Sequence, residues 1–139
     1  MIVRCISRTG EALPTFAYDS RQGVTAQTEF AVTPGRAYHV FGVTVLLGIA
    51  WYYVLGDDGL AWPIWMPAPL FEVVDGSIPV SWIVGYFRFS RDSQYPMISF
   101  PEWATDHEFY ERLVDGEPEA ARVFALRRAE VEGASQFKV

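Results

Sequence analysis

The pattern of hydrophobic and polar positions divides the chain into a long strand-like part and a shorter helical part. The most apolar stretch is Ala37 to Asp75, and before Glu72 its only formal charges are Asp57 and Asp58. This stretch is dense in β-branched and aromatic residues and is interrupted by Gly and Pro. Such a composition favours strands joined by tight turns. We therefore expect residues 1–100 to be mainly β.

Turn residues separate the expected strands of this first part. Thr33–Arg36 has Pro second and Gly third, the pattern of a type II turn, and Gly56–Gly59 fits a hairpin connection. Gly42 should bend a long strand, because a missing side chain permits strong curvature. Arg8–Gln27 and Arg91–Pro96 are expected as loops. The expected strands are Met1–Ser7, Thr28–Val32, Tyr38–Leu47, Ala50–Leu55, Leu60–Trp65, Leu70–Val74, Trp82–Phe89 and Met97–Phe100.

A helical period replaces the strand pattern over Glu102–Val131. Phe109 and Leu113 are four residues apart, the spacing of one helix face. Gly116 suits the end of a first helix, and Pro118 suits the first turn of a second. We therefore expect two short helices after the strands.

The length of 139 residues is typical of one domain. Within it, residues 1–100 are expected to be mainly β, 101–133 helical, and 134–139 a tail. The predicted fold class is α+β: a small, strongly bent antiparallel β-barrel followed by two short C-terminal helices.

The charge balance restricts the expected partners. The chain carries 17 acidic and 11 basic residues, a net charge of −6, and its basic residues form no cluster beyond Arg127–Arg128. Binding to nucleic acid normally needs a basic face that displaces counterions from phosphates. We therefore expect no nucleic acid partner, and instead a basic protein whose approach an acidic surface would accelerate.

One uncharged stretch is long enough to be a membrane span. The twenty residues from Ala37 to Gly56 carry no formal charge, which meets the length of a membrane span. Their polar atoms, two internal glycines and β-branched content favour strands instead, so no membrane partner is expected. Cys5 has no second cysteine to pair with and is expected as a buried strand residue. No secretory signal is visible, and a cytoplasmic location is expected.

Residues suited to chemistry are few. His39 lies in an expected strand with no second His or Cys at ligand spacing, so a structural histidine is expected. His107 stands near Asp106 and Glu111, but the paired-His spacing of a zinc helix is absent. No nucleophile motif or Gly-rich phosphate loop is present. We therefore expect no metal, no cofactor and no enzymatic activity.

Two sets of side chains are candidates for binding a partner. Exposed Trp and Tyr commonly anchor interfaces, and the aromatic set is Trp51, Tyr52, Tyr53, Trp62, Trp65 and Trp82. Residues 102–119 hold seven acidic residues and one Arg, which could be a solvated face or a docking surface. The candidate partner-binding residues are Asp57, Asp58, Glu102, Asp106, Glu108, Glu111, Asp115, Trp62 and Trp65.

One run of the sequence resembles a known kind of protein. The run AYHVFGV…WYYVLGDDG…WPIWMPAPLFEVVDGSIPVSW resembles small bacterial SH3-like barrel proteins that serve as immunity partners of polymorphic toxins. The resemblance covers about residues 30–82. It implies an SH3-like barrel that binds and neutralises a cognate toxin, and it implies no catalytic residues.

Three functional hypotheses follow. The first is a non-catalytic protein-binding module that blocks a cognate bacterial toxin. The second is a small-molecule binding domain or enzyme with an aromatic-lined barrel pocket, formed by Trp51, Trp62 and Trp82. The third is an accessory subunit of a larger complex.

Overall fold

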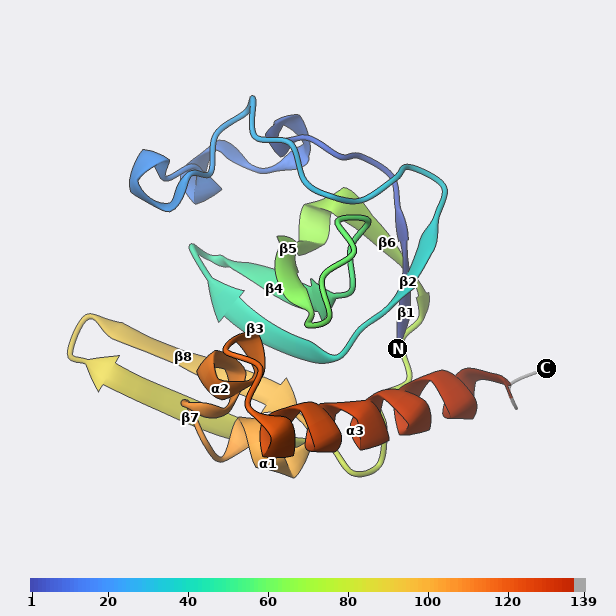
Figure 1. Cartoon of the computed structure of the whole chain (residues 1–139). Helices are drawn as coiled ribbons and strands as arrows, with labels where there is room; N and C mark the ends of the chain where they lie inside the picture. Colours follow the sequence, from blue (N-terminus) through green and yellow to red (C-terminus); the bar gives the residue numbers. More distant parts are fainter. Residues whose placement is uncertain (137–139) are drawn as a thin grey trace.

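Two antiparallel sheets and a set of C-terminal helices make up the computed structural model, which describes residues 1–136 (Figure 1). The first sheet has the strand order β2-β1-β6 and the second the order β5-β4-β3-β8-β7. The α+β class predicted from the sequence is confirmed. The strands are β1 (Ile2–Cys5), β2 (Ala37–His39), β3 (Gly42–Leu46), β4 (Ile49–Val54), β5 (Ile64–Pro67), β6 (Phe71–Asp75), β7 (Ile83–Ser90) and β8 (Ser93–Ser99).

One bent segment joins the two sheets. The expected long strand at 38–47 is divided into β2 and β3, with the change of direction at Val40 and Phe41. The backbone N–H of Val40 still donates to Met1 in the first sheet, whereas that of Phe41 donates to Tyr53 in the second. The predicted bend is present next to Gly42, which begins β3. A Cβ on Gly42 would meet Cε of Met97, the flexible end of that side chain.

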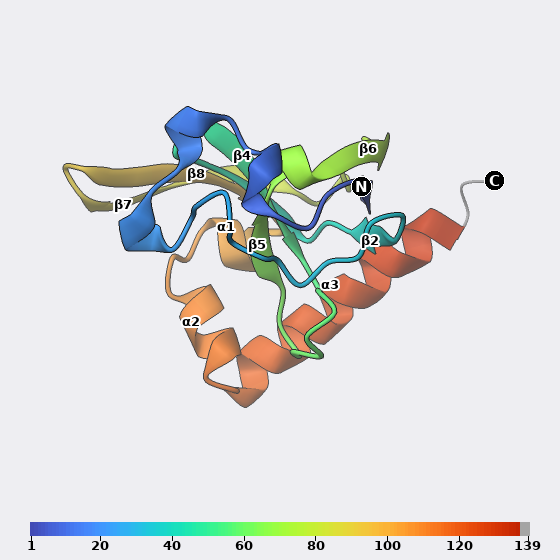
Figure 2. The same cartoon turned by 90° about the horizontal axis from the view of Figure 1, so that it is seen from above.

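The predicted closed barrel is not observed among the described strands. Each sheet keeps two edges, β2 and β6 in the first and β5 and β7 in the second. The bend at Gly42 folds the first sheet over one end of the second, where the Tyr52 and Phe71 rings lie 6.0 Å apart. The β7–β8 hairpin projects away from the first sheet and stays uncovered by it (Figures 1 and 2).

The predicted loop at 91–96 is confined to the turn at 91–92, because β8 begins at Ser93 and pairs with β7 along its whole length. Pro96 has no backbone N–H to donate to a ladder, yet it lies within β8. In the structure it pairs with Tyr86, and the pairing of β8 with β3 is confined to Met97 and Ile98. The proline therefore lies beyond the part of β8 that is hydrogen-bonded on both sides.

Two further expected strands differ. Residues 28–32 form no strand beyond the single bridge between Thr9 and Glu29, and β5 begins at Ile64 where the sequence suggested Leu60. Residues 60–63 instead form the connection from the Asp57–Asp58 turn. The long N-terminal loop contains three short 3₁₀ helices: η1 (Gly10–Ala12), η2 (Thr15–Ala17) and η3 (Ser20–Gln22).

Three helices follow the strands, not the two expected: α1 (Pro101–Ala104), α2 (Phe109–Val114) and α3 (Pro118–Gln136). The predicted boundary between Gly116 and Pro118 is confirmed, with Gly116 at φ 77° ending α2. The tail expected at 134–139 is wrong for 134–136, which continue α3, and residues 137–139 lie outside the described part. Figure 2 shows α3 running along one side of the molecule.

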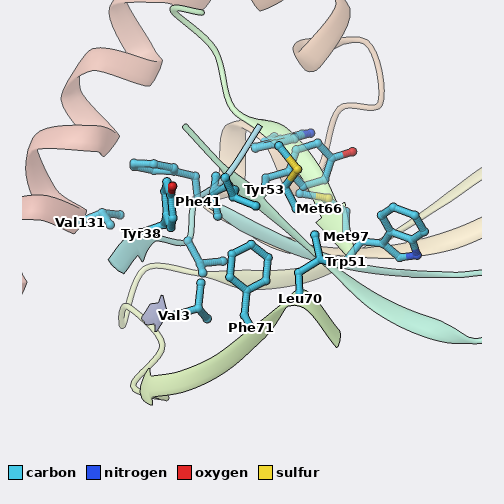
Figure 3. Close-up of a cluster of buried hydrophobic side chains, with 14 of the residues drawn as sticks. Val3, Tyr38, Phe41, Trp51, Tyr53, Met66, Leu70, Phe71, Met97 and Val131 are labelled. Atoms are coloured by element: carbon cyan, nitrogen blue, oxygen red, sulfur yellow. The ribbon is translucent and has the colours of Figure 1, made fainter. Parts of the chain in front are cut away.

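A single buried cluster joins the sheets to the helices (Figure 3). Trp103 of α1 packs against Tyr53 of β4, with ring centroids 4.6 Å apart, and Phe41 packs against Phe124 of α3 at 5.4 Å. Cys5 is buried in β1, as expected, and burial raises the pKa of its thiol. Among residues 1–136 no helix is both long and apolar enough to cross a membrane.

Candidate functional site

The two faces of the second sheet differ sharply in burial. One continuous cross-strand row runs through Gly85, Met97, Thr44 and Trp51, and the last three of these side chains are buried. A Cβ on Gly85 would lie 1.7 Å from the carbonyl oxygen of Ala104, so α1 packs directly on this strand. This inner face therefore belongs to the core.

The neighbouring row points to the opposite side, because successive residues of a strand alternate. It runs from Val84 through Ile98 and Val43 to Tyr52. Tyr52 is covered by Phe71 of the first sheet, but Val84 at the other end is 71% exposed. The row thus becomes more open from β4 towards β7.

A second row on the same side continues this open area. Tyr86 pairs with Pro96 and is 49% exposed, and Val45 on β3 is 46% exposed. We call the six apolar side chains that share this side of β3, β8 and β7 the outer sheet face: Val43, Val45, Val84, Tyr86, Pro96 and Ile98.

The outer sheet face is poor in charge. Across the five strands of this sheet Arg88 is the one formally charged residue, and its guanidinium lies over the Tyr86 ring at 4.9 Å. Within the outer sheet face, Val84, Tyr86 and Val45 are the most exposed side chains. Contiguous exposed apolar surface of this kind marks interaction sites more often than ordinary surface.

The acidic run predicted as a docking surface is largely engaged in ion pairs with arginines. The Asp106 carboxylate is 2.6 Å from Arg112, which also lies 3.2 Å from Glu117 and 3.9 Å from Glu108. The hydrogen bond from Arg112, followed by that from the Glu108 backbone N–H, holds the pKa of Asp106 below its ordinary value. Sequence spacing alone did not show that one arginine meets three of these acids.

Glu102 is similarly engaged. Two nitrogens of Arg127 on α3 donate to its two carboxylate oxygens at 3.0 and 3.1 Å, which ties α1 to α3. Glu111 and Asp115 are exposed and have no ion-pair partner among residues 1–136. The predicted set therefore contains both structural ion pairs and free surface charges.

The two predicted tryptophans lie in different cavities. Trp62 lines a cavity of about 290 Å³ with Leu113 and Phe124, against the helices. Trp65 lines another of about 290 Å³ with Trp51. The proposed pocket shared by Trp51, Trp62 and Trp82 is not formed, since Trp82 is buried and lines neither cavity.

Asp57 has a structural role in the turn region. Its carboxylate accepts hydrogen bonds from Thr33 Oγ1, Arg36 Nη1 and Tyr38 Oη at 2.5, 2.9 and 2.9 Å. The Asp57 backbone N–H also donates to Ala31. Burial, and then this carboxylate, raises the pKa of the Tyr38 hydroxyl. The neighbouring Asp58 side chain accepts a long hydrogen bond of 3.4 Å from the Leu60 backbone N–H.

This difference between adjacent carboxylates gives a prediction. Replacing Asp57 with Ala should lower the free energy of unfolding by about 1–2 kcal/mol, because the hydroxyl of the buried Tyr38 loses its acceptor, as does the exposed Thr33 hydroxyl. The control Asp58→Ala removes the same charge and should change stability by less than about 0.5 kcal/mol. Urea denaturation of both variants measures this, and equal losses would contradict the structural role.

The two histidines belong to different environments. His39 on β2 has a buried Nδ1 without a hydrogen-bond partner, beside a polar hollow of about 340 Å³ that Arg128 and Glu132 also line. Desolvation lowers the pKa of His39 below its usual 6.5, outweighing the opposite effect of Glu132. His107 is exposed and its ring packs edge-on against Phe89.

A pH dependence follows from His39. Since its folded-state pKa is lowered, the unfolded chain binds a proton first as pH falls below about 6.5. Above that pH, His39 should not reduce the free energy of unfolding. As the pH falls from about 6.5 to the lower folded-state pKa, the free energy of unfolding should decrease. The variant His39→Leu should lack this slope, while His107→Gln should keep it. Urea midpoints between neutral and mildly acidic pH test this, and an unchanged slope in His39→Leu would contradict it.

Within the part of the chain that the structure describes, no group of three or more His, Cys, Asp or Glu side chains is placed to hold a metal ion. The candidate site that the structure brings out is the outer sheet face, which was not predicted as a site. The sequence did contain one indication of this face. In an extended strand over Trp82–Phe89, successive side chains alternate, which puts Val84, Tyr86 and Arg88 on the same side.

Comparison with known proteins assigns no family to this chain. No family model matches it, and no curated protein or solved structure matches it either.

Proposed function

We propose that the protein is a non-catalytic protein-binding module that binds a cognate bacterial toxin and blocks it, as an immunity protein does. The observation that carries the proposal is the outer sheet face, an apolar surface on three adjacent strands with Val84 71% exposed. A soluble chain gains from covering such a surface with a partner.

The expected partner is a basic protein with an apolar contact patch. The chain has a net charge of −6, yet the contact area holds Arg88 as its charged residue and no carboxylate. Apolar contact can therefore form without desolvating acids, while exposed carboxylates such as Glu111 and Asp115 attract the partner from a distance. Like-charge repulsion disfavours a second copy of this chain as the occupant.

The mechanism of neutralisation would be steric. The module binds over or beside the toxin's active site and excludes its substrate, which needs no chemistry from this chain. The resemblance of residues 30–82 to small SH3-like immunity proteins supports this class of partner. It also favours an SH3-like arrangement of the bent β2–β3 segment and its neighbours.

The experiment is co-expression with the product of the adjacent gene, followed by light scattering on the purified chain and on the mixture. The proposal expects a stable heterodimer and rescue of cells that express the toxin-like neighbour. A homodimer that buries the outer sheet face would overturn the choice of partner. A stable complex that leaves the neighbour's toxicity unchanged would overturn the immunity function.

A further inference from the structure

A cavity on another part of the molecule has features that the proposed function does not use. It encloses about 290 Å³ between residues 22–31 of the N-terminal segment and the β3–β4 turn with β5. Its walls are largely apolar, and both Trp51 and Trp65 line it, with ring centroids 5.3 Å apart. The volume is near the lower end for small-molecule pockets, so the ligand must be small.

The charges around this cavity have one sign. Glu29 and Asp58 line it, and no Lys, Arg or His does. Neither carboxylate has an ion-pair partner within residues 1–136. Two carboxylates without counter-charges beside an aromatic wall favour a cation that is itself partly apolar.

The aromatic wall is held in place. The Trp51 indole N–H donates to the carbonyl oxygen of Leu46 at 2.9 Å, which fixes the ring against the β3–β4 turn. The same turn places Leu47 at φ 54°, a left-handed conformation that is unfavourable for leucine, and Leu47 lines the cavity. Leu47 and Gly48 are the two turn residues between β3 and β4, and both have the positive φ that a two-residue hairpin turn requires.

We propose that this cavity binds a small organic cation, a guanidinium or an alkylammonium group. The indole of Trp65, which is half-buried, supplies a cation–π contact, and the carboxylates of Glu29 and Asp58 supply the counter-charge. The group could belong to a free small molecule or to an arginine side chain of a protein. Both sources present the same chemistry.

The test uses the isolated chain, so it does not depend on the proposed toxin partner. Binding is measured by calorimetry and by the NMR shift of the Trp65 indole N–H. The guanidinium probe is N-acetyl-arginine methylamide, with the citrulline analogue as its neutral counterpart. The ammonium probe is choline, with 3,3-dimethylbutan-1-ol as its neutral counterpart. At least one cation should bind about tenfold more tightly than its neutral counterpart.

Variants assign that preference to the cavity. Glu29→Gln with Asp58→Asn should weaken the cation about tenfold and leave the neutral probe unchanged. The control Glu111→Gln with Asp115→Asn removes the same charge elsewhere and should have no effect. Preference for the arginine amide assigns the site to a protein side chain, and preference for choline to a free ammonium compound. Equal binding of neutral probes, no binding, or an unaffected cavity variant would overturn the proposal.

Discussion

Replacing Gly85 with alanine is expected to lower the free energy of unfolding by about 3 kcal/mol or more. A Cβ at this position would lie 1.7 Å from the carbonyl oxygen of Ala104, and the obstacle is backbone, which cannot turn aside as a flexible side chain can. Either β7 or α1 would have to move, and overpacking of this kind separates packed elements. Because Gly85 faces α1, strand alternation directs its neighbours Val84 and Tyr86 to the outer sheet face.

The matched control for this prediction is Gly76→Ala. Gly76 lies on the connection before β7, and the nearest atom to its ideal Cβ is Val73 Cγ1 at an ordinary 3.6 Å. Its stability should change by less than about 1 kcal/mol. Urea denaturation of the two variants decides the matter. A Gly85→Ala protein as stable as Gly76→Ala would show that α1 does not pack on β7 as described.

Replacing Val84 with lysine is expected to weaken the complex with the cognate partner by about 2 kcal/mol, or roughly thirtyfold. The side chain is 71% exposed in the free chain, so the variant should fold normally. In the complex the new ammonium group would be desolvated in an apolar contact and would repel a basic partner. Surface plasmon resonance measures the affinity.

Leu126→Lys is the control for that variant. Leu126 is a comparably exposed apolar residue on α3, on another part of the molecule, and its replacement adds the same charge. Its affinity should fall only by the small, salt-dependent amount that one charge costs at long range. Equal losses in both variants would show that net charge, and not the outer sheet face, governs binding.

Local signals in the sequence predicted much of the strand-rich part. Gly42 marked the bend between β2 and β3, and Pro34–Gly35 marked a turn that the structure confirms, with Gly35 at φ 88° and the Arg36 N–H donating to Thr33. These features depend on the backbone conformation at single positions, and a Gly or Pro in the sequence indicates that conformation. The extent of β8 could not be predicted in this way, because the place of Pro96 in the strand depends on where the pairing with β3 ends.

The candidate site could not be predicted in the same way. Whether an acid is free or paired depends on which arginine meets it across the fold, as Arg127 of α3 meets Glu102 of α1 at 2.9 Å. Alternation did place Val84 and Tyr86 on one side of a strand. It could not show that the first sheet covers the Tyr52 end of this side and leaves the Val84 end open.

We expect the outer sheet face to become buried when the partner binds. Hydrogen–deuterium exchange of the chain, alone and in complex with the product of the adjacent gene, measures this. The structure predicts new protection along β7, β8 and β3, with α2 unchanged. Protection confined to α2 and residues 58–65, with β7 exchanging as in the free chain, would contradict this expectation and return the acidic helices to the role of docking surface.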